Sequence, residues 1–162
     1  MFKRNMRNSS GFTLIELVVI IVVLGILAAV AIPRLFDVTE EAEKAAVNAM
    51  ISNLESAGSI YTAKQFVNSQ PITAHNLFGD LSNIPSNYEG ENDPVTVSNT
   101  PNGKWSWCAT GNWLVYNPKS GITGGWTSGG EKFIKYQVQV VVDGSDTVGI
   151  KLTTTGCYTY SW

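Results

Sequence analysis

The sequence predicts an α+β fold in which one long N-terminal hydrophobic helix packs by its C-terminal half on a sheet of roughly four antiparallel strands. Three observations support this prediction. Residues 12–32 form a largely apolar run of twenty-one positions that contains one charge, Glu16. The stretch after it, to about Phe66, places apolar residues at helical spacing. The last thirty residues alternate apolar and polar side chains, as a strand hairpin does.

The apolar run is long enough to cross a membrane. As a helix at about 1.5 Å per residue it matches a hydrocarbon core about 30 Å thick. The leader before it carries Lys3, Arg4 and Arg7 but no acid, whereas acids follow between positions 37 and 43. This bias keeps the N-terminus cytoplasmic and exports the rest. A cleaved secretory signal peptide is the alternative, but its apolar core spans only about 7–15 residues and ends at a small-residue cleavage site, which this run lacks.

Glu16 is a lone carboxylate inside this run. A charged side chain near mid-membrane costs about 2.5–3.5 kcal/mol on insertion scales and is by default functional, with a partner to be named. No cationic residue stands near it in the sequence.

These residues resemble a known family. A basic leader ending in Gly11, then Phe12-Thr13-Leu14-Ile15-Glu16-Leu17, then an apolar run to Pro33, is similar to the class III signal of type IV pilins and type II secretion pseudopilins. The resemblance covers about the first 60 residues. It implies the pilin fold, cleavage after Gly11 by a membrane aspartyl peptidase, the prepilin peptidase, and N-methylation of Phe12.

The resemblance also implies partners and a location. Glu16 is expected to meet the positive Phe12 amine of a neighbouring copy, which removes the burial penalty that each charge has alone. Copies of the chain then form an open helical filament. An inner-membrane assembly platform, a motor ATPase and, before assembly, the lipid bilayer are implied partners. The expected location is the inner membrane of a bacterium, with the C-terminal domain outside the cytoplasm, followed by a surface pilus or a periplasmic pseudopilus.

Together these features divide the chain into five segments. They are a cleaved basic leader (1–11), a transmembrane and filament-core helix (12–33), an amphipathic second half of that helix (34–67), a connecting loop region (68–104) and an antiparallel sheet with a disulfide-bounded C-terminal region (105–162).

Pro33 predicts a kink or a melted turn between Gly25 and Pro33. A proline inside a helix removes one backbone donor and clashes with the carbonyl four residues earlier, at a cost of about 3 kcal/mol. The alternative is that Pro33 ends the membrane helix and a second helix begins. Arg34, which follows it, is expected to extend its charge to the outer headgroups.

The amphipathic stretch carries an apolar stripe that should pack on the sheet. The acidic run Glu40-Glu41-x-Glu43 predicts a solvated face, with a basic patch on a neighbouring copy as the alternative. The connecting region favours loops and one short helix near residues 75–81. Its acidic stretch 88–93 lacks the ligand spacing of a calcium-binding EF-hand loop, so a polar turn is expected and no metal site is predicted.

The C-terminal part predicts about four strands, at residues 105–109, 113–116, 134–142 and 148–152, with a turn at 143–146 and a loop at 124–130. Cys108 and Cys157 lie in the exported part, where thiols oxidise, and predict a disulfide. Strand parity places that bridge on the outer side of the sheet. The five tryptophans favour core packing, with a sugar-binding platform as the alternative.

Neither catalysis nor nucleic-acid binding is predicted. His75 is the only histidine, so no histidine triad can be built, and no phosphate-binding glycine motif is present. Removing the leader leaves eight basic and thirteen acidic side chains, a formal net of −5, whereas nucleic-acid surfaces are basic. No cofactor is expected. Three hypotheses remain: a type IV pilus subunit acting in adhesion, motility or DNA uptake, which the sequence favours; a pseudopilin forming a piston-like filament; and a membrane-tethered carbohydrate-binding domain.

Overall fold

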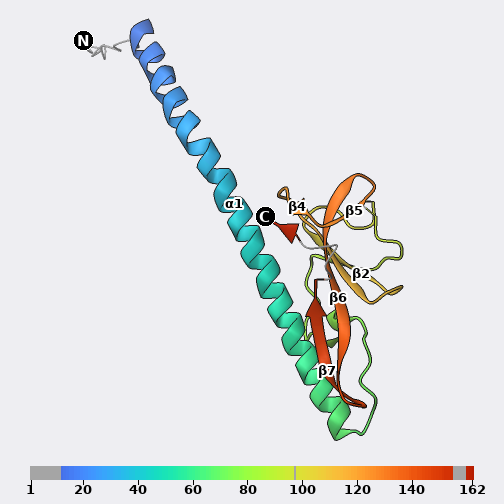
Figure 1. The fold of residues 1–162 in the computed structure, drawn as a ribbon. Helices are drawn as coiled ribbons and strands as arrows, with labels where there is room; N and C mark the ends of the chain where they lie inside the picture. Colours follow the sequence, from blue (N-terminus) through green and yellow to red (C-terminus); the bar gives the residue numbers. More distant parts are fainter. Residues whose placement is uncertain (1–11, 97, 155–159) are drawn as a thin grey trace, which may run out of the picture. The chain divides into compact units, whose positions relative to one another are not determined.

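The computed structural model describes residues 12–96, 98–154 and 160–162. The chain divides into two compact units, one ending at Thr39 and one spanning Glu40–Trp162, which we call the head. Figure 1 shows the elements. They are α1 (Leu14–Val67), the 3₁₀ helix η1 (Leu77–Asp80), β1 (Tyr88–Glu91), β2 (Lys104–Cys108), β3 (Trp113–Asn117), β4 (Thr123–Gly124), β5 (Trp126–Ser128), β6 (Glu131–Asp143), β7 (Asp146–Thr153) and β8 (Tyr160–Ser161).

Helix α1 continues through Pro33 without a break in helical structure. The melted turn and the second helix beginning at Pro33 are therefore both wrong. The helix tolerates the missing proline donor because the hydrogen bonds on either side remain in place, although the proline ring still crowds the carbonyl of Ala29. The bend expected between Gly25 and Pro33 stays a prediction.

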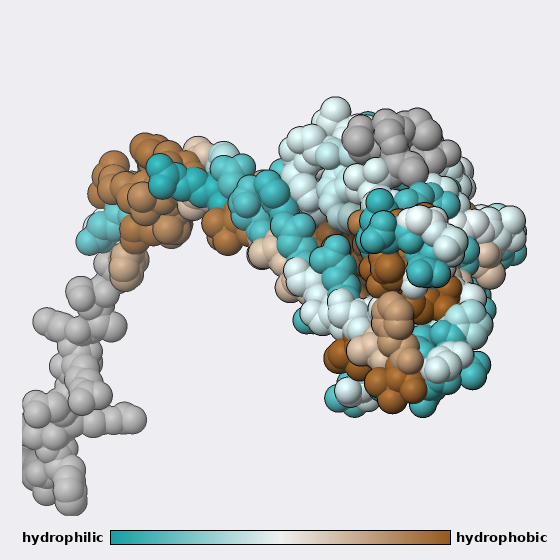
Figure 2. Space-filling view, turned by 60° about the horizontal axis from the view of Figure 1, so that its bottom comes forward, coloured by the Kyte–Doolittle hydropathy of each residue, from teal (hydrophilic) through white to brown (hydrophobic). Residues whose placement is uncertain are grey.

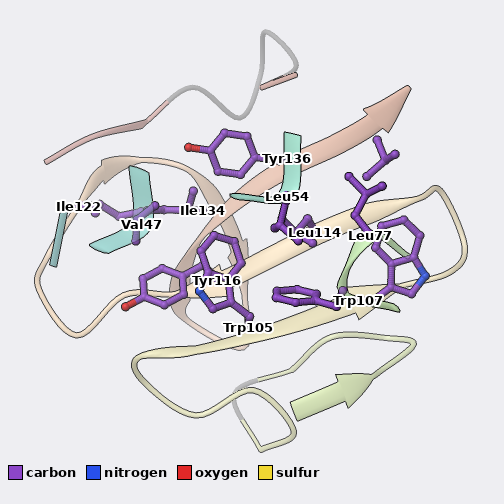
Figure 3. Packing of buried hydrophobic residues seen from close by; sticks show 12 residues of the cluster. Val47, Leu54, Leu77, Trp105, Trp107, Leu114, Tyr116, Ile122, Ile134 and Tyr136 are labelled. Carbon is purple, nitrogen blue, oxygen red and sulfur yellow. The ribbon is translucent and has the colours of Figure 1, made fainter. Parts of the chain in front are cut away.

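The C-terminal half of α1 forms one wall of the head's main core. Its buried residues recur at helical spacing, and all but Thr62 belong to the predicted apolar stripe: Val47, Leu54, Ala57, Gly58 and Thr62. They meet side chains from η1 and from the strands (Figure 3). Leu54, Phe78 and Leu114 are fully buried there, and Trp105 is 1% exposed. The α+β prediction, with the helix packed on a sheet, is confirmed.

The sheet contains the four expected strands, which are β2, β3, β6 and β7, all paired antiparallel. It is larger and more mixed than predicted. β1 pairs with β2 in parallel, so the purely antiparallel expectation is wrong. β5 adds to the start of β6, and the two-residue strands β4 and β8 form a separate pair. Both β1 and β5 lie where loops were predicted. They are short segments without a clear strand pattern, and they become strands only through pairing with a neighbouring strand.

The hairpin of β6 and β7 is confirmed at the predicted turn. Asp143 opposes Asp146, and Gly144 has a φ of 62°, a backbone conformation that glycine adopts without strain. β3 pairs with β6 only between Ile134 and Gln137. The far part of the hairpin therefore extends beyond β3 as two strands.

A second cluster covers the sheet face opposite the main core. Val95, Val115 and Phe133 are its buried members, and Cys108, Trp113 and Trp126 pack against it. The ammonium of Lys135 lies 3.8 Å from the centre of the Trp113 ring and 4.8 Å from that of Trp126, a cation–π arrangement. Since Trp105 and Trp107 are buried in the main core, tryptophan side chains contribute to packing on both faces.

Cys108 lies on this second face, the side on which strand parity placed the predicted disulfide. Burial and the neighbouring Asp93 raise the pKa of its thiol. The other cysteine, Cys157, lies outside the described residues, so the bridge stays a prediction.

The connecting region is ordered by polar contacts. The expected short helix is present as η1, whose N-cap Asn76 accepts a hydrogen bond from Phe78 N–H at 3.1 Å. Further along, the Asn92 amide donates to Ser106 Oγ at 3.0 Å, and the buried Asn117 amide donates to the Thr100 carbonyl at 2.8 Å. These bonds satisfy buried groups that would otherwise be costly.

The acidic stretch 88–93 does not converge on one point. Glu89 pairs with Lys104 at 2.8 Å, Glu91 accepts from the Asn76 amide at 3.1 Å, and Asp93 accepts from Thr110 N–H at 2.8 Å. Within the described residues, no group of three or more His, Cys, Asp or Glu side chains is placed to hold a metal ion.

Candidate assembly site

The N-terminal unit presents a largely apolar helix surface. Every large apolar side chain from Phe12 to Val38 is at least 40% exposed, and Figure 2 shows apolar surface along this part of the helix. By length and composition, α1 is the one helix among the described residues that could cross a membrane. Such a surface requires a bilayer or another protein around it.

Glu16 and Thr13 cap the start of α1. Glu16 Oε2 accepts hydrogen bonds from Thr13 N–H at 2.8 Å and from Thr13 Oγ1 at 2.7 Å. In return, Glu16 N–H donates to Thr13 Oγ1 at 3.3 Å. This reciprocal arrangement is a capping box. The capping box was not among the predicted features, although a threonine followed three residues later by glutamate is its usual sequence signature.

The structure brings Phe12 and Glu16 to the same region of the helix. Phe12, Ile15, Val19 and Ile20 line a shallow hollow around the Glu16 carboxylate. Among the described residues, the ion pairs found do not involve Glu16. Within residues 12–96, 98–154 and 160–162, the carboxylate is thus held by neutral donors in apolar surroundings and forms no ion pair. Gly11, the predicted cleavage residue, lies outside the described residues.

A second carboxylate, Glu43, anchors a loop of the head to α1. Its Oε1 accepts from Tyr116 Oη and from Lys119 N–H, both at 2.7 Å, and its Oε2 accepts from Ser120 N–H at 2.8 Å. Burial alone would raise the pKa of Glu43, but the bonds from Lys119, Tyr116 and Ser120 together hold that pKa below its usual value. The solvated face predicted for this acidic run is therefore wrong at Glu43, because the loop after β3 turns its backbone donors toward it.

Replacing Glu43 by glutamine should lower the free energy of unfolding by about 1–3 kcal/mol at neutral pH, since charge-assisted bonds to backbone donors are lost. The pKa of Glu43 is lower in the folded state than in the unfolded state, where it is near 4.5. Its contribution to the free energy of unfolding is therefore present at pH values above the unfolded pKa and is lost as pH falls through the folded pKa. Urea unfolding of the full chain in detergent, followed by tryptophan fluorescence at neutral and acidic pH, measures this.

Glu41→Gln is the matched control for this prediction. Glu41 loses the same charge on the same helix, but its side chain is 72% exposed and its contact with Lys44 is 3.9 Å long. Equal destabilisation by the two substitutions, or a Glu43→Gln effect that persists undiminished in acid, would contradict the anchor.

Comparison with known proteins extends these observations. Residues 6–32 match the prokaryotic N-terminal methylation motif. The chain is 38% identical over 93 residues to the type IV narrow pilus major component PilA5 of Thermus thermophilus, covering 56% of this chain and 78% of that protein. It is 39% identical over 71 residues to type II secretion system core protein G of Aeromonas hydrophila, covering 44% and 48%. A fimbrial protein of Pseudomonas aeruginosa is 38% identical over 66 residues, covering 40% and 43%.

The extent of these matches differs between the relatives. The chain spans over three quarters of the pilus component but about half of the secretion protein. No solved structure matches the chain significantly. The methylation motif, the long apolar helix and the coverage of the pilus component agree with one another: the chain belongs to the family of type IV pilins and type II secretion pseudopilins.

Proposed function

We propose that the chain is the structural subunit of a type IV pilus, cut after Gly11, methylated at Phe12 and polymerised into a helical filament for adhesion, motility or DNA uptake. The observation that carries this proposal is the exposed apolar surface of α1 from Phe12 to Ile32, in which Glu16 is the one carboxylate. Before assembly the bilayer covers this surface, and in a filament other copies of the chain cover it.

The geometry of Glu16 supports the assembly step. Cleavage after Gly11 leaves the capping box intact, because it consists only of Thr13 and Glu16, and it creates a positive amine on Phe12. Glu16 of one copy is proposed to meet the Phe12 amine of the next copy. Pairing inside an apolar filament core offsets the cost that either charge alone would have there.

The proposal includes partners and an orientation. The prepilin peptidase processes the chain, and an inner-membrane platform with a motor ATPase moves it from the bilayer into the filament. The basic leader stays cytoplasmic and the head lies outside, following the Lys/Arg bias. The role is structural and not enzymatic, in line with the relatives, which are pilus and secretion-system components.

We also propose that Cys108 and Cys157 form a disulfide in the exported head. The closed loop of about 50 residues would stabilise the head by about 4 kcal/mol in the chain-entropy model. Cys108 is half-buried on the second face of the sheet, where a bridge could hold the C-terminal segment.

A pseudopilin is the second candidate function. It is supported by the similarity to type II secretion core protein G from several bacteria, including Vibrio cholerae at 36% identity. The helix and its carboxylate serve a short periplasmic filament equally well. The tethered carbohydrate-binding domain is less well supported, because Trp105 and Trp107 are buried and Trp113 and Trp126 contact Lys135.

Electron microscopy of filaments sheared from the native cell, with mass spectrometry of the subunit's N-terminus, tests the proposal. Long surface filaments built from chains that start at N-methylated Phe12 are expected. Processed chains that stay in the envelope without surface filaments would instead identify a pseudopilin. An unprocessed Met1 start would overturn both.

A further inference from the structure

One stretch of α1 just beyond the membrane-length run exposes large apolar side chains. Leu35, Phe36 and Val38 are 65%, 70% and 66% exposed. Arg34 beside them is the only basic residue between the leader and Lys44. Asp37, one turn away, is not within ion-pair distance of it, and the ion pairs found in the described part of the chain do not include Arg34. A bilayer supplies headgroup phosphates to such an arginine, but a filament does not.

The far end of the β6–β7 hairpin carries the complementary features. The apolar face of β6 is buried against the main core at Ile134, Tyr136 and Val138, and the same face continues outward at Val140 and Val142. Val142 is 62% exposed, and Val148 on β7 is 41% exposed. The core face of the sheet thus extends past the side chains that cover it.

Two acids close this end of the hairpin. Asp143 and Asp146 oppose each other across the turn, both exposed, and the ion pairs of the described residues involve neither. The turn lies at the same end of the head as the end of α1 (Figure 1). Viewed toward that end, the head shows apolar patches between polar surface (Figure 2). Valines flanked by carboxylates therefore form a surface that we call the hairpin end, made of Val142, Asp143, Asp146 and Val148.

We propose that the hairpin end of one copy docks on the Arg34–Val38 segment of a neighbouring copy in the filament. Val142 and Val148 pack on Leu35, Phe36 and Val38, and the Asp143 and Asp146 carboxylates accept hydrogen bonds from the Arg34 guanidinium. The inference rests on the proposed function, because only a filament removes Arg34 from the lipid headgroups.

Charge complementarity favours a second copy as the occupant. The guanidinium offers paired N–H donors that suit carboxylates, and burial of the flanking apolar side chains strengthens such a contact. Contact between the exposed apolar side chains on the two sides would remove both from water. Docking would replace the headgroup contacts of Arg34 with protein carboxylates at the step when the helix leaves the bilayer.

Cysteine cross-linking in filaments tests this interface. Cells that co-express a Phe36→Cys chain and a Val142→Cys chain are treated with a mild oxidant, and sheared filaments are examined for cross-linked dimers. We expect cross-linked dimers only when both variant chains are present. Their yield should be about tenfold higher than the yield from Phe36→Cys co-expressed with Ile84→Cys, because a disulfide forms only between cysteines that lie close together. Ile84 is a matched control because it is an apolar head residue with the same 62% exposure as Val142.

A charge exchange supplies a second measurement that does not depend on new cysteines. Arg34→Glu should lower filament yield about tenfold or more, because it places like charges together. Adding Asp143→Arg and Asp146→Arg to the same chain should restore most of the yield. If Arg34→Glu only destabilised the helix, the two aspartate substitutions would not restore the filament yield.

The outcomes separate this inference from the proposed function. Wild-type cells without filaments would overturn both. Filaments that cross-link no better through Val142 than through Ile84, or an Arg34→Glu defect that the two aspartate reversals leave unchanged, would overturn the interface while the filament proposal remains.

Discussion

Cells whose only copy of this chain carries Glu16→Leu should assemble no filaments, while the protein still accumulates in the membrane. Leucine removes the one acid in the first turn of the apolar helix, and an ionised side chain in a membrane segment opposes insertion, so insertion becomes easier. It also removes the proposed partner of the Phe12 amine, which would then be buried in the filament core as an unpaired charge, at a cost of about 3–5 kcal/mol per contact. Filament yield by shearing and electron microscopy, with membrane levels by immunoblotting, measures both effects.

Two controls make this result specific. Glu41→Leu removes an acid from an exposed position of the same helix and should leave filament yield near the wild-type level. Glu16→Gln keeps the acceptor oxygen for Thr13 but removes the charge, so it should fail as Glu16→Leu does if the charge is what assembly needs. Normal filaments from Glu16→Leu cells would contradict the assembly mechanism.

The largest loss of head stability is expected for Leu54→Ala. Leu54 is fully buried where α1 meets the sheet, among the side chains drawn in Figure 3. Truncation of a buried leucine leaves a cavity and typically lowers the free energy of unfolding by about 2–5 kcal/mol. Trp105 and Trp107 lie in the same cluster, so tryptophan fluorescence during urea unfolding of the full chain in detergent reports the change directly.

Ile60→Ala is the matched control on the same helix. Ile60 is 58% exposed, so its truncation should change the free energy of unfolding by no more than about 0.5 kcal/mol. A Leu54→Ala effect as small as that of Ile60→Ala would mean that the helix is not held to the sheet by this cluster.

Patterns along the chain were sufficient for the elements whose signals are local. The membrane-length run, the stripe Val47–Leu54–Gly58 on α1 and the alternation of β6 with β7 each repeat at a fixed period, and each predicted the correct element. The capping box at Thr13 and Glu16 was also readable, from its spacing alone. Such features depend on neighbours within a few residues.

Features that join distant segments were not predictable in this way. β1 becomes a strand through its parallel pairing with β2, and β5 through its pairing with β6. Glu43 binds Tyr116, Lys119 and Ser120, which lie more than seventy residues away. Sequence periodicity does not indicate contacts between residues so far apart. The pattern around Glu43 therefore predicts a solvent-exposed side chain.

By itself the sequence determined the long apolar helix, its lone carboxylate, the amphipathic continuation, the strand hairpin and the family resemblance, because hydrophobic periodicity and composition act locally. Only the tertiary structure decided that α1 stays helical through Pro33, that the sheet is mixed, that Glu43 anchors a loop, and that the apolar face of the hairpin extends to exposed Val142 and Val148. The last three depend on which segments the packed chain brings together and which surfaces it covers, and burial is a property of the whole fold.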